Sequence, residues 1–325
     1  MQTFQTEVEA ADAMHQAYQN IKREISKVII GQEEVINRLL TAIFCQGHCL
    51  LIGVPGLAKT LLVQTIASAL ELEFNRIQFT PDLMPSDILG AETLDQERNF
   101  KFIKGAIFAN IILADEINRT PPKTQSALLE AMQEYAVTIA GKRYELSRPF
   151  FVLATQNPIE QEGTYPLPEA QLDRFMFNIM LTYPSYEAEV EIVKNTTSSK
   201  VNQVEKVISG KEIQAFQQLV RKVPIADNVV EYLVKLVHKT RPNTAAASPQ
   251  ANKYLEWGAG PRASQYLALG AKCNALLRGS YTPEIQDVKA VAVDILRHRL
   301  VRNFKAEAEG ISIEQIIHNI MNEIR

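Results

Sequence analysis

The sequence has no long hydrophobic run and little of the chemistry that marks a secreted or metal-binding protein. No apolar stretch approaches the roughly 18 residues that a membrane span needs, and the polar segment from Met1 does not have the pattern of a signal peptide. Three cysteines and five histidines in 325 residues show no metal-ligand spacing. We therefore expect a cytoplasmic protein without a membrane span, in which Cys45, Cys49 and Cys273 are core thiols.

An excess of charge of one sign is also missing. Lysine and arginine total 34 against 37 aspartate and glutamate residues, which gives a formal net charge of −3. A chain without a global basic field is not expected to bind nucleic acid by default. The hydrophobic content of 46% is ordinary for a globular protein, and the length allows two domains.

The most specific local pattern lies near the start of the first expected strand. The apolar residues Cys49–Ile52 predict that strand, and Gly53–Thr60 follow as a glycine-containing turn that leads into a helix. Backbone N–H groups in such a turn can surround phosphate oxygens. Lys59 would then reach the β- and γ-phosphates, and Thr60 would offer its hydroxyl to Mg²⁺. Ala58 departs from the general pattern, which has glycine before the lysine, so an ordinary strand-turn-helix corner is the alternative.

An acidic pair supports the phosphate-loop interpretation. The four apolar residues Ile111–Ala114 predict a strand that is buried on both faces and ends at Asp115 and Glu116. Ligands of open parallel sheets bind at the carboxyl ends of the strands. Asp115 could therefore lie just behind the direct ligands of Mg²⁺, and Glu116 could orient or deprotonate an attacking water. Without the phosphate loop upstream, an exposed pair that caps the next turn would be preferred.

Alternation of strands and helices predicts an α/β core. Strands that alternate with helical stretches such as Leu61–Leu70 and Thr124–Glu134 form parallel sheets covered by helices. We expect five strands, with a hairpin at residues 137–146 inserted between the third and fourth. The expected strands are Cys49–Ile52, Arg76–Phe79, Ile111–Ala114, Phe150–Ala154 and Met176–Leu181.

After residue 184 only helical periodicity remains. We therefore expect an α/β core over residues 1–187 and a smaller all-α domain over residues 188–325. The stretch Arg241–Trp257 is predicted to be a flexible loop because it is rich in alanine, serine and proline. Ser312 and Gln315 form a candidate capping box before an apolar helical stripe.

Three further polar residues stand at the ends of expected elements. Asn157 follows the fourth strand, where its amide could hold the lytic water or the γ-phosphate; the alternative is a turn asparagine before proline. Arg174 stands directly before the fifth strand, and its guanidinium could stabilise negative charge on phosphate; the alternative is a surface salt bridge.

The third of these residues is Arg262. Gly260 and Pro261 can serve as the N-cap and first residue of a helix, which places Arg262 in the first turn. The helix dipole disfavours a cation there, so an anion such as the γ-phosphate would explain this arginine.

The ordered set of these motifs resembles the AAA+ ATPases and, more closely, the MoxR family. The similarity extends from about Ile30 to the C-terminus, and alanine before the lysine is usual in the MoxR pattern. One departure is Gly260, where the family pattern has serine. The blocks that carry the resemblance are GVPGLAKT at residues 53–60, ADEINR at 114–119, TQSALLEAM at 124–132, ATQNP at 154–158, LPEAQLDRF at 167–175 and GAGPRA at 258–263.

The resemblance implies a role for each matching residue. Glu116 would be the catalytic carboxylate, Asn157 sensor 1, Arg262 sensor 2, and Arg174 an arginine finger that acts on a neighbouring subunit. Thr60 and Asp115 would hold Mg²⁺. The segment from Val28 to Gln32 would line the adenine pocket. The implied ATP-binding residues are Ile30, Gly31, Gly53, Pro55, Gly56, Leu57, Ala58, Lys59, Thr60 and Leu61.

The resemblance also implies an assembly and its partners. Family members form hexameric rings, carry a helical insert that would fall near residues 91–105, and present that insert and the hairpin to partners. They act as chaperone-like ATPases that mature or activate protein complexes, often with von Willebrand factor A domain proteins. We therefore expect an ATP- and Mg²⁺-dependent ATPase that remodels protein clients.

Two alternatives remain open on the sequence. The first is a nucleotide-loaded scaffold in which ATP orders the ring and hydrolysis is incidental. The second is a DNA motor or a magnesium chelatase motor subunit, for which Lys142 and Arg143 at the tip of the hairpin are the only local support. His298, between Arg297 and Arg299, is interpreted as a structural residue of the helical domain.

Overall fold

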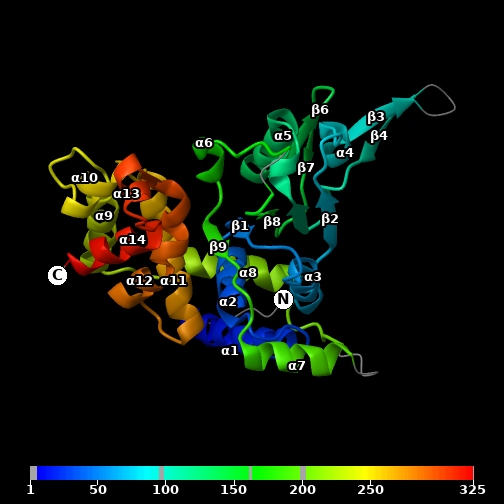
Figure 1. Ribbon diagram of the computed structural model, residues 1–325. Coiled ribbons are helices and arrows are strands. Elements are labelled where there is room, and N and C mark those ends of the chain that lie inside the picture. The colour runs from blue at the N-terminus through cyan, green and yellow to red at the C-terminus, as the bar shows by residue number, and fades with distance from the viewer. Residues whose placement is uncertain (1–5, 95–98, 161–162, 198–202, 325) are drawn as a thin grey trace. The chain divides into compact units, whose positions relative to one another are not determined.

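The computed structural model describes residues 6–94, 99–160, 163–197 and 203–324. Close packing divides the chain into two compact units, which are drawn in Figure 1. The α/β unit contains Gln19–Arg174 and Ile179–Gln214, and the helical unit contains the residues up to Tyr18, Phe175–Asn178 and Ala215–Arg325. The domain boundary that we expected at residues 187–188 therefore falls within a segment grouped with the α/β unit.

A five-stranded sheet with the order β2-β5-β8-β1-β9 forms the core of the α/β fold. β2 runs parallel to β5, β5 to β8, and β8 to β1. All residues of β5 and the first five of β8 are buried, as strands covered on both faces require. The predicted parallel five-stranded sheet is confirmed. Its strands are β1 (Cys49–Ile52), β2 (Phe74–Gln78), β5 (Ile111–Asp115), β8 (Phe151–Gln156) and β9 (Phe177–Met180).

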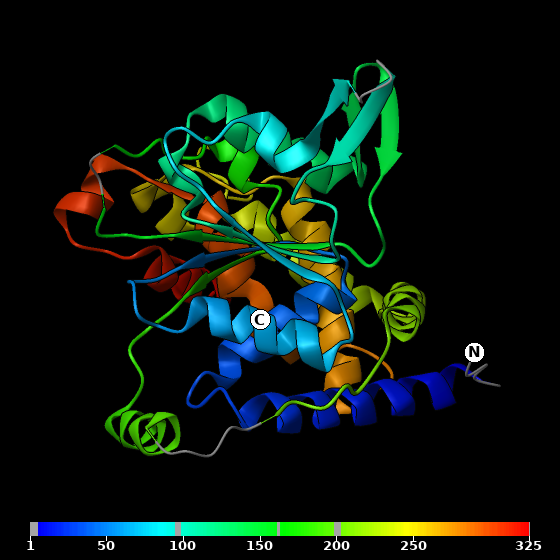
Figure 2. The same ribbon diagram turned by 90° about the vertical axis from the view of Figure 1, so that its right-hand side faces the viewer.

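Helices cover both faces of this sheet (Figure 2). α2 and α3 lie on one face, and α4 and α5 on the other. α2 buries the apolar positions Val35, Leu39, Leu40 and Ile43, which recur at helical spacing. The helices of the α/β unit and of its borders are α1 (Glu7–Ser26), α2 (Glu33–Phe44), α3 (Lys59–Ala69), α4 (Pro85–Leu89), α5 (Pro122–Glu134), α6 (Glu169–Leu172), α7 (Tyr186–Thr196) and α8 (Gly210–Lys222), with the 3₁₀ helix η1 (Ile117–Arg119).

Two β-hairpins are inserted in the α/β unit and pack against each other. Phe102 of one hairpin stacks on Tyr144 of the other, with ring centroids 4.1 Å apart. The second hairpin is the one predicted at residues 137–146. The hairpins pair β3 (Gly90–Leu94) with β4 (Phe100–Lys104) and β6 (Ala136–Ile139) with β7 (Lys142–Glu145), each antiparallel.

The first hairpin corrects the helical insert expected near residues 91–105. Both described arms of this insert are strands, and residues 95–98 lie outside the described part of the chain. Phe100–Lys104 alternate phenylalanine or isoleucine with lysine over most of their length, a pattern that favours a strand. The expectation of a helix came from the family resemblance and overlooked this local alternation.

The second unit is helical and contains one short two-stranded sheet. Its last helix, α14, begins after the predicted capping box: Ser312 Oγ accepts the Gln315 N–H at 3.2 Å, and Gln315 Oε1 accepts the Ser312 N–H at 3.0 Å. The predicted capping box is therefore confirmed. The elements are α9 (Asp227–Lys239), α10 (Pro249–Tyr254), β10 (Leu255–Trp257), α11 (Pro261–Arg278), α12 (Ile285–Leu296), η2 (Arg297–Arg299), β11 (Val301–Arg302), α13 (Phe304–Ala308) and α14 (Ile313–Asn322).

The prediction of a flexible loop at Arg241–Trp257 was wrong. α10 begins inside this stretch, where Ser248 Oγ accepts the Ala251 N–H at 2.9 Å and Pro249 occupies the first helical position. β10 then pairs with β11. A serine N-cap followed by proline is a helix-start signal. The prediction relied on the overall composition of the stretch and therefore overlooked this signal.

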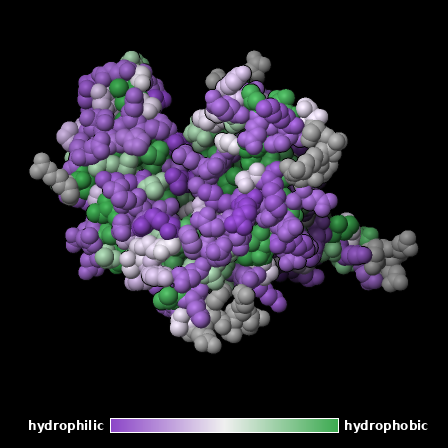
Figure 3. Space-filling view, turned by 90° about the horizontal axis from the view of Figure 1, so that it is seen from below, coloured by the Kyte–Doolittle hydropathy of each residue, from purple (hydrophilic) through white to green (hydrophobic). Residues whose placement is uncertain are grey.

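Three observations describe the surface and the core. Within the described ranges, no helix is long and apolar enough to cross a membrane. On the face shown in Figure 3, hydrophilic side chains predominate and hydrophobic ones form small separate groups. Cys45, Cys49 and Cys273 are buried thiols outside any disulfide bond, as predicted.

A buried histidine links three elements of the α/β unit. His48 precedes β1, and its Nδ1 accepts the Val152 N–H of β8 at 3.0 Å. Its Nε2 lies 3.2 Å from the Met132 carbonyl oxygen of α5 and donates to it. Burial lowers the pKa of His48 to about 4, although the Met132 carbonyl opposes this shift. Protonation of Nδ1 would replace an acceptor with a second donor facing the Val152 N–H.

We expect acid to destabilise the α/β unit through His48. The unfolded chain takes up this proton near pH 6.5, whereas the folded chain does so only near pH 4. Because the unfolded state binds more protons between these values, the free energy of unfolding falls as pH is lowered through this window, by on the order of 3 kcal/mol in full. Denaturant titrations across the window measure it.

A His48→Gln variant is expected to flatten this pH profile, and His318→Gln is the matched control because His318 is exposed on α14. Equal slopes for the wild type and His48→Gln would contradict the assignment.

Candidate active site

The turn between β1 and α3 has the backbone geometry of a phosphate cradle. Gly56 has φ +87°, and a Cβ built there would meet nothing within 4 Å, so the turn is open on that side. Ala58 also takes the left-handed conformation, with φ 53° and ψ 27°, directly before α3 begins at Lys59. That conformation costs a residue with a Cβ roughly 1–2 kcal/mol, which explains why glycine is usual in the general pattern.

Lys59 is the cation of this turn. Its Nζ donates to the Gly53 carbonyl oxygen at 2.8 Å, so the side chain folds back along the loop. Partial burial lowers the pKa of Lys59, and the carboxylates of Asp115, Glu116 and Glu160 act in the opposite direction. An ammonium group at the mouth of an open turn of N–H groups is suited to phosphate oxygens.

Asp115 ends β5 and is held by two side chains. Its Oδ1 accepts the Thr155 hydroxyl at 2.6 Å. Its Oδ2 accepts Nη2 of Arg76 at 2.6 Å and Nε of Arg76 at 3.1 Å. Oδ1 accepts only one of these bonds and so has a second lone pair, which leaves capacity to bind a cation or a water.

Glu116 follows in the left-handed conformation, with φ 57° and ψ 49°. Its N–H donates to Thr155 Oγ1 at 2.9 Å. Its Oε2 accepts Nε2 of Gln78 at 2.8 Å and Nη1 of Arg119 at 3.1 Å. A non-glycine residue in this conformation stores strain of the kind often found at functional sites, and here it turns the carboxylate away from the line of β5.

The Thr155 hydroxyl thus fixes both acidic residues, which leads to a prediction. Thr155→Val keeps the shape of the side chain but removes its hydroxyl. The Asp115 carboxylate then loses a donor, and the Glu116 N–H loses its acceptor. We expect a loss of about 1–3 kcal/mol in the free energy of unfolding. We also expect nucleotide turnover to fall about tenfold to a hundredfold from misplacement of the acidic pair.

Thr65→Val is the matched control for this experiment. Thr65 is also buried, but its hydroxyl bonds only the Leu61 carbonyl of its own helix, at 2.7 Å. Calorimetry and steady-state turnover on the two variants give the comparison. Equal turnover in both would remove Thr155 from its positioning role.

Asn157 stands at the end of β8, beside the strand that carries the acidic pair. β5 and β8 pair in parallel, which confirms the predicted neighbourhood of the two strands. Asn157 is 5% exposed, and its Oδ1 accepts the Ile159 N–H at 3.1 Å. This bond fixes the side chain and leaves the amide N–H₂ group available as a donor.

These side chains meet in one cavity of about 480 Å³. It combines a helix N-terminus, a cation, an acidic pair and an amide. The structure therefore brings the phosphate turn, the acidic pair and Asn157 together at one cavity. The lining residues are Pro55, Gly56, Leu57, Ala58, Lys59, Thr60, Leu61, Arg76, Asp115, Glu116 and Asn157.

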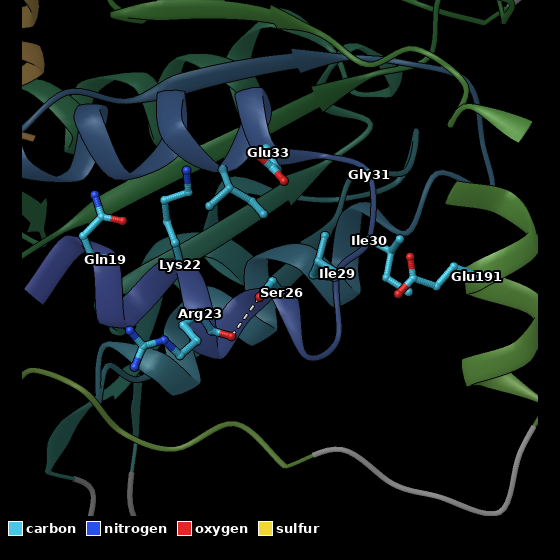
Figure 4. Close-up of a pocket in the computed structure, with 10 residues that line it drawn as sticks. Gln19, Lys22, Arg23, Ser26, Ile29, Ile30, Gly31, Glu33 and Glu191 are labelled. Atoms are coloured by element: carbon cyan, nitrogen blue, oxygen red, sulfur yellow. Dashed lines mark hydrogen bonds between the residues drawn. The ribbon is translucent and has the colours of Figure 1, made fainter. Parts of the chain in front are cut away.

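The expected adenine segment lines a second cavity, of about 570 Å³ (Figure 4). Ile30 and Gly31 contribute from the loop before α2, and Glu191 contributes from α7. Gly31 has φ +74°, and a Cβ there would stand 2.8 Å from the Cβ of Ala188 on α7, so only glycine fits. The remaining residues are Gln19, Lys22, Arg23, Ser26, Ile29, Glu33 and Ile36.

A hydrogen bond links the expected adenine segment to the phosphate turn. Gln32 follows Gly31, and its Nε2 donates to the Leu57 carbonyl oxygen of the phosphate turn at 3.2 Å. The expected adenine segment is thereby tied to the turn that would hold the phosphates.

The two predicted arginines, Arg174 and Arg262, are not among the residues that line these cavities. Arg174 follows α6, and its N–H donates to the Gln171 carbonyl oxygen at 3.2 Å. Arg262 lies in the first turn of α11, with Gly260 as N-cap and Pro261 as the first residue, as predicted. Arg262 belongs to the helical unit.

Four side chains of the site were not identified from the sequence. Gln78 connects the acidic residues, because its Oε1 accepts Nη2 of Arg76 at 2.5 Å while its amide donates to Glu116. Alternation along β2 places Arg76 and Gln78 on one face, which was a usable signal once β2 was known to neighbour β5. Arg119 and Thr155 lay inside recognised motif blocks, but nothing in their spacing showed which atoms they would contact.

The donor chemistry also fits a divalent cation. A threonine hydroxyl and a carboxylate are hard oxygen ligands of the kind that Mg²⁺ binds together with substrate phosphates. Thr60 and Asp115 line the same cavity. In the described residues no cluster of three or more His, Cys, Asp or Glu could hold a metal ion by itself.

A glycine-containing turn that leads into a helix, a lysine at its end and an acidic pair on a neighbouring parallel strand together define a phosphate-loop nucleoside triphosphatase. The profile of the ATPase family associated with various cellular activities (AAA) matches residues 48–177, and that of the AAA lid domain matches residues 248–320.

Similar proteins narrow the class. The chain is 43% identical to Chaperone MoxR1 of Mycobacterium tuberculosis over 302 residues, which covers 93% of this chain and 80% of that protein. It is 41% identical to the uncharacterized protein YeaC of Bacillus subtilis, with 93% and 92% covered. A crystal structure titled "putative ATPase" from Cytophaga hutchinsonii superposes with a TM-score of 0.91 at 46% identity, with 98% and 97% covered. The chain belongs to the MoxR family of AAA+ ATPases.

Proposed function

We propose that this MoxR-family ATPase hydrolyses ATP with Mg²⁺ at sites shared between the subunits of a hexameric ring. The energy released drives chaperone-like maturation of protein complexes in the cytoplasm. The observation that carries the proposal is the convergence of Lys59, the acidic pair and Asn157 on one cavity at the carboxyl edge of the sheet. That edge is where open α/β sheets bind their ligands.

The phosphate turn binds the substrate. N–H groups of the turn and of the α3 N-terminus surround phosphate oxygens, and Lys59 moves from the Gly53 carbonyl to the β- and γ-phosphates. Ile30 and Gly31 line the adenine side. Thr60 and Asp115 would hold Mg²⁺, which would supply charge neutralisation at the phosphates.

Glu116 and Asn157 act on the water. Glu116 accepts a proton from the attacking water or orients it, and Asn157 donates its amide to the water or to the γ-phosphate. In the present arrangement Glu116 is engaged by Gln78 and Arg119. Both bonds fall on Oε2, so Oε1 is the oxygen that accepts from a water in the cavity.

Arginines complete the site. Arg174 of a neighbouring subunit contacts the γ-phosphate, where a guanidinium can bind two oxygens at once. Arg262 acts as the second sensor; a cation in the first turn of a helix is favoured only where an anion lies close to it.

The partners are protein clients, including von Willebrand factor A domain proteins, that meet the paired hairpins. Lys142 and Arg143 do not favour a nucleic-acid partner, because both form ion pairs with carboxylates. Lys142 lies 3.8 Å from Glu92, and Arg143 lies 2.9 Å from Glu145.

A model client tests the proposal. Thermally unfolded citrate synthase is incubated with the protein and either ATP or a non-hydrolysable analogue, with and without chelation of Mg²⁺. Recovery that requires hydrolysis and Mg²⁺ is expected. Equal protection by the analogue would instead identify a nucleotide-loaded scaffold.

A further inference from the structure

The Arg297–Arg299 triplet holds the backbone that directly follows Arg174. Arg299 is 8% exposed, and its Nη2 donates to the Phe175 carbonyl oxygen at 2.7 Å. Nη1 of the same guanidinium donates to the carbonyl oxygens of Ile295 and of Met176, the latter at 3.4 Å. One planar group therefore binds two consecutive carbonyls of the segment Phe175–Asn178 and one carbonyl of α12.

Arg297 fixes the other end of the same segment. Its Nη1 donates to the Asn178 carbonyl oxygen. Its charge is balanced by Glu314, 2.6 Å from Nε, and by Asp294, 3.1 Å from Nη1. The guanidinium is thus oriented by two carboxylates while it holds the backbone.

His298 between them is neutral. Burial, together with the charges of Arg299 and Arg297, lowers its pKa well below the ordinary value, against the opposing effect of the Phe175 carbonyl. Its Nε2 lies 3.0 Å from the Phe175 carbonyl oxygen and 2.7 Å from Nη1 of Arg299, and the tautomer of the ring decides whether this nitrogen donates to the first or accepts from the second. The His298 ring and the Arg299 guanidinium therefore meet at the same Phe175 carbonyl oxygen.

The segment Phe175–Asn178 is also held by the packing of its side chains. Phe175, Met176 and Phe177 are fully buried. Met176 packs beside Gly270 of α11, where an added Cβ would lie 3.4 Å from its Cε. Arg174 is joined to this segment by one peptide bond, so the position of its backbone carbonyl and Cα depends on where Phe175 is fixed.

We propose that Arg299 and Arg297 are positioning residues for Arg174. They set the backbone of residues 175–178 and thereby the reach of the Arg174 guanidinium toward phosphate. This inference rests on the proposed function, in which Arg174 stabilises the transition state in a neighbouring subunit. A displacement of about 1 Å in such a group can reduce turnover about a hundredfold.

Arg299→Lys tests the proposal with the smallest change. Lysine keeps the charge, but a single ammonium cannot reproduce the planar fork that spans the Phe175 and Met176 carbonyls. We expect kcat to fall about tenfold to a hundredfold. The dissociation constant for a fluorescent ATP analogue should stay within about twofold, since every contact of Lys59 and the acidic pair is retained.

Arg302→Lys is the matched control. Arg302 also donates to a backbone carbonyl of the helical unit, that of Ile311 at 3.1 Å, but this carbonyl is outside the held segment. Its kcat should remain that of the wild type. Thermal unfolding of both variants shows whether any loss comes from unfolding, and Arg297→Gln provides a second change on the same segment.

A double-mutant cycle with Arg174→Ala decides the mechanism. If Arg299 acts through Arg174, then Arg299→Lys lowers kcat in the wild type and has no further effect in the Arg174→Ala background. Multiplied losses, an unchanged kcat in Arg299→Lys, or an equal loss in Arg302→Lys would overturn the inference. The Arg174→Ala single variant distinguishes failure of the proposed function from failure of this inference. If it retains full turnover, the proposed role of Arg174 itself fails.

Discussion

Replacing Glu116 with glutamine should abolish ATP turnover while ATP still binds. Glutamine has the same shape, and its amide oxygen can accept from Gln78 and Arg119 as Glu116 Oε2 now does, at 2.8 and 3.1 Å. The fold and the phosphate turn should therefore be unchanged. An amide cannot take a proton from water at neutral pH, so the general-base contribution of about 10²–10⁴ is lost.

Glu160→Gln is the matched control for Glu116→Gln. Glu160 lies 3.9 Å from the same Arg119, so this substitution removes the same charge beside the same arginine. Its turnover should stay within about twofold of the wild type. Phosphate release and fluorescent-ATP binding on both variants are the measurements. Undiminished hydrolysis in Glu116→Gln, or equal losses in the two variants, would remove Glu116 from the role of base.

Replacing Arg174 with alanine should reduce turnover by about 10³ or more, the size of effect that arginine fingers contribute. The nucleotide affinity of the variant's own subunit should not change, because its phosphate turn and acidic pair are intact. Arg143→Ala removes an exposed arginine of the same unit and is the control, with wild-type turnover expected.

Mixed assemblies show whether Arg174 acts in trans. Lys59→Ala subunits cannot hold the phosphates but keep Arg174, whereas Arg174→Ala subunits keep the phosphate site. Each is expected to be inactive alone, and the mixture should recover activity because one subunit supplies what its neighbour lacks. A mixture that stays silent would mean that Arg174 acts on its own site.

The sheet was predictable because its signal is local. Ile111–Asp115 form a continuous apolar run before the acidic pair, which is how a doubly covered strand must be built. The spacing of residues in the phosphate turn then predicted that Lys59 lies at the carboxyl edge of that sheet. Asn157 was predicted at the same edge because it directly follows another expected strand. The C-terminal capping box was equally local, since the side chains of Ser312 and Gln315 each accept the other's backbone N–H, three residues apart.

Contacts between distant segments were not predictable. Arg76 and Gln78 reach Asp115 and Glu116 from a strand 39 and 38 residues away in sequence, and only the strand order reveals that these strands are neighbours. The partners of Arg299 are 123 and 124 residues away. A triplet of two arginines around a histidine carries no sequence signal of what it will hold.

The two errors had different physical origins. The hairpin at β3 and β4 was missed because a family expectation was preferred to the local alternation of phenylalanine and lysine. α10 was missed because composition was weighed above the Ser248–Pro249 helix start. In both cases the short-range backbone preference decided the structure.

The central claim is that ATP is hydrolysed at a site to which two subunits contribute. Steady-state ATP hydrolysis measured across a wide range of protein concentration tests it most directly. We expect specific activity to rise with concentration and to reach a plateau as subunits assemble. Specific activity that is substantial and constant down to concentrations at which the protein is monomeric, verified by light scattering in the same samples, would contradict the claim.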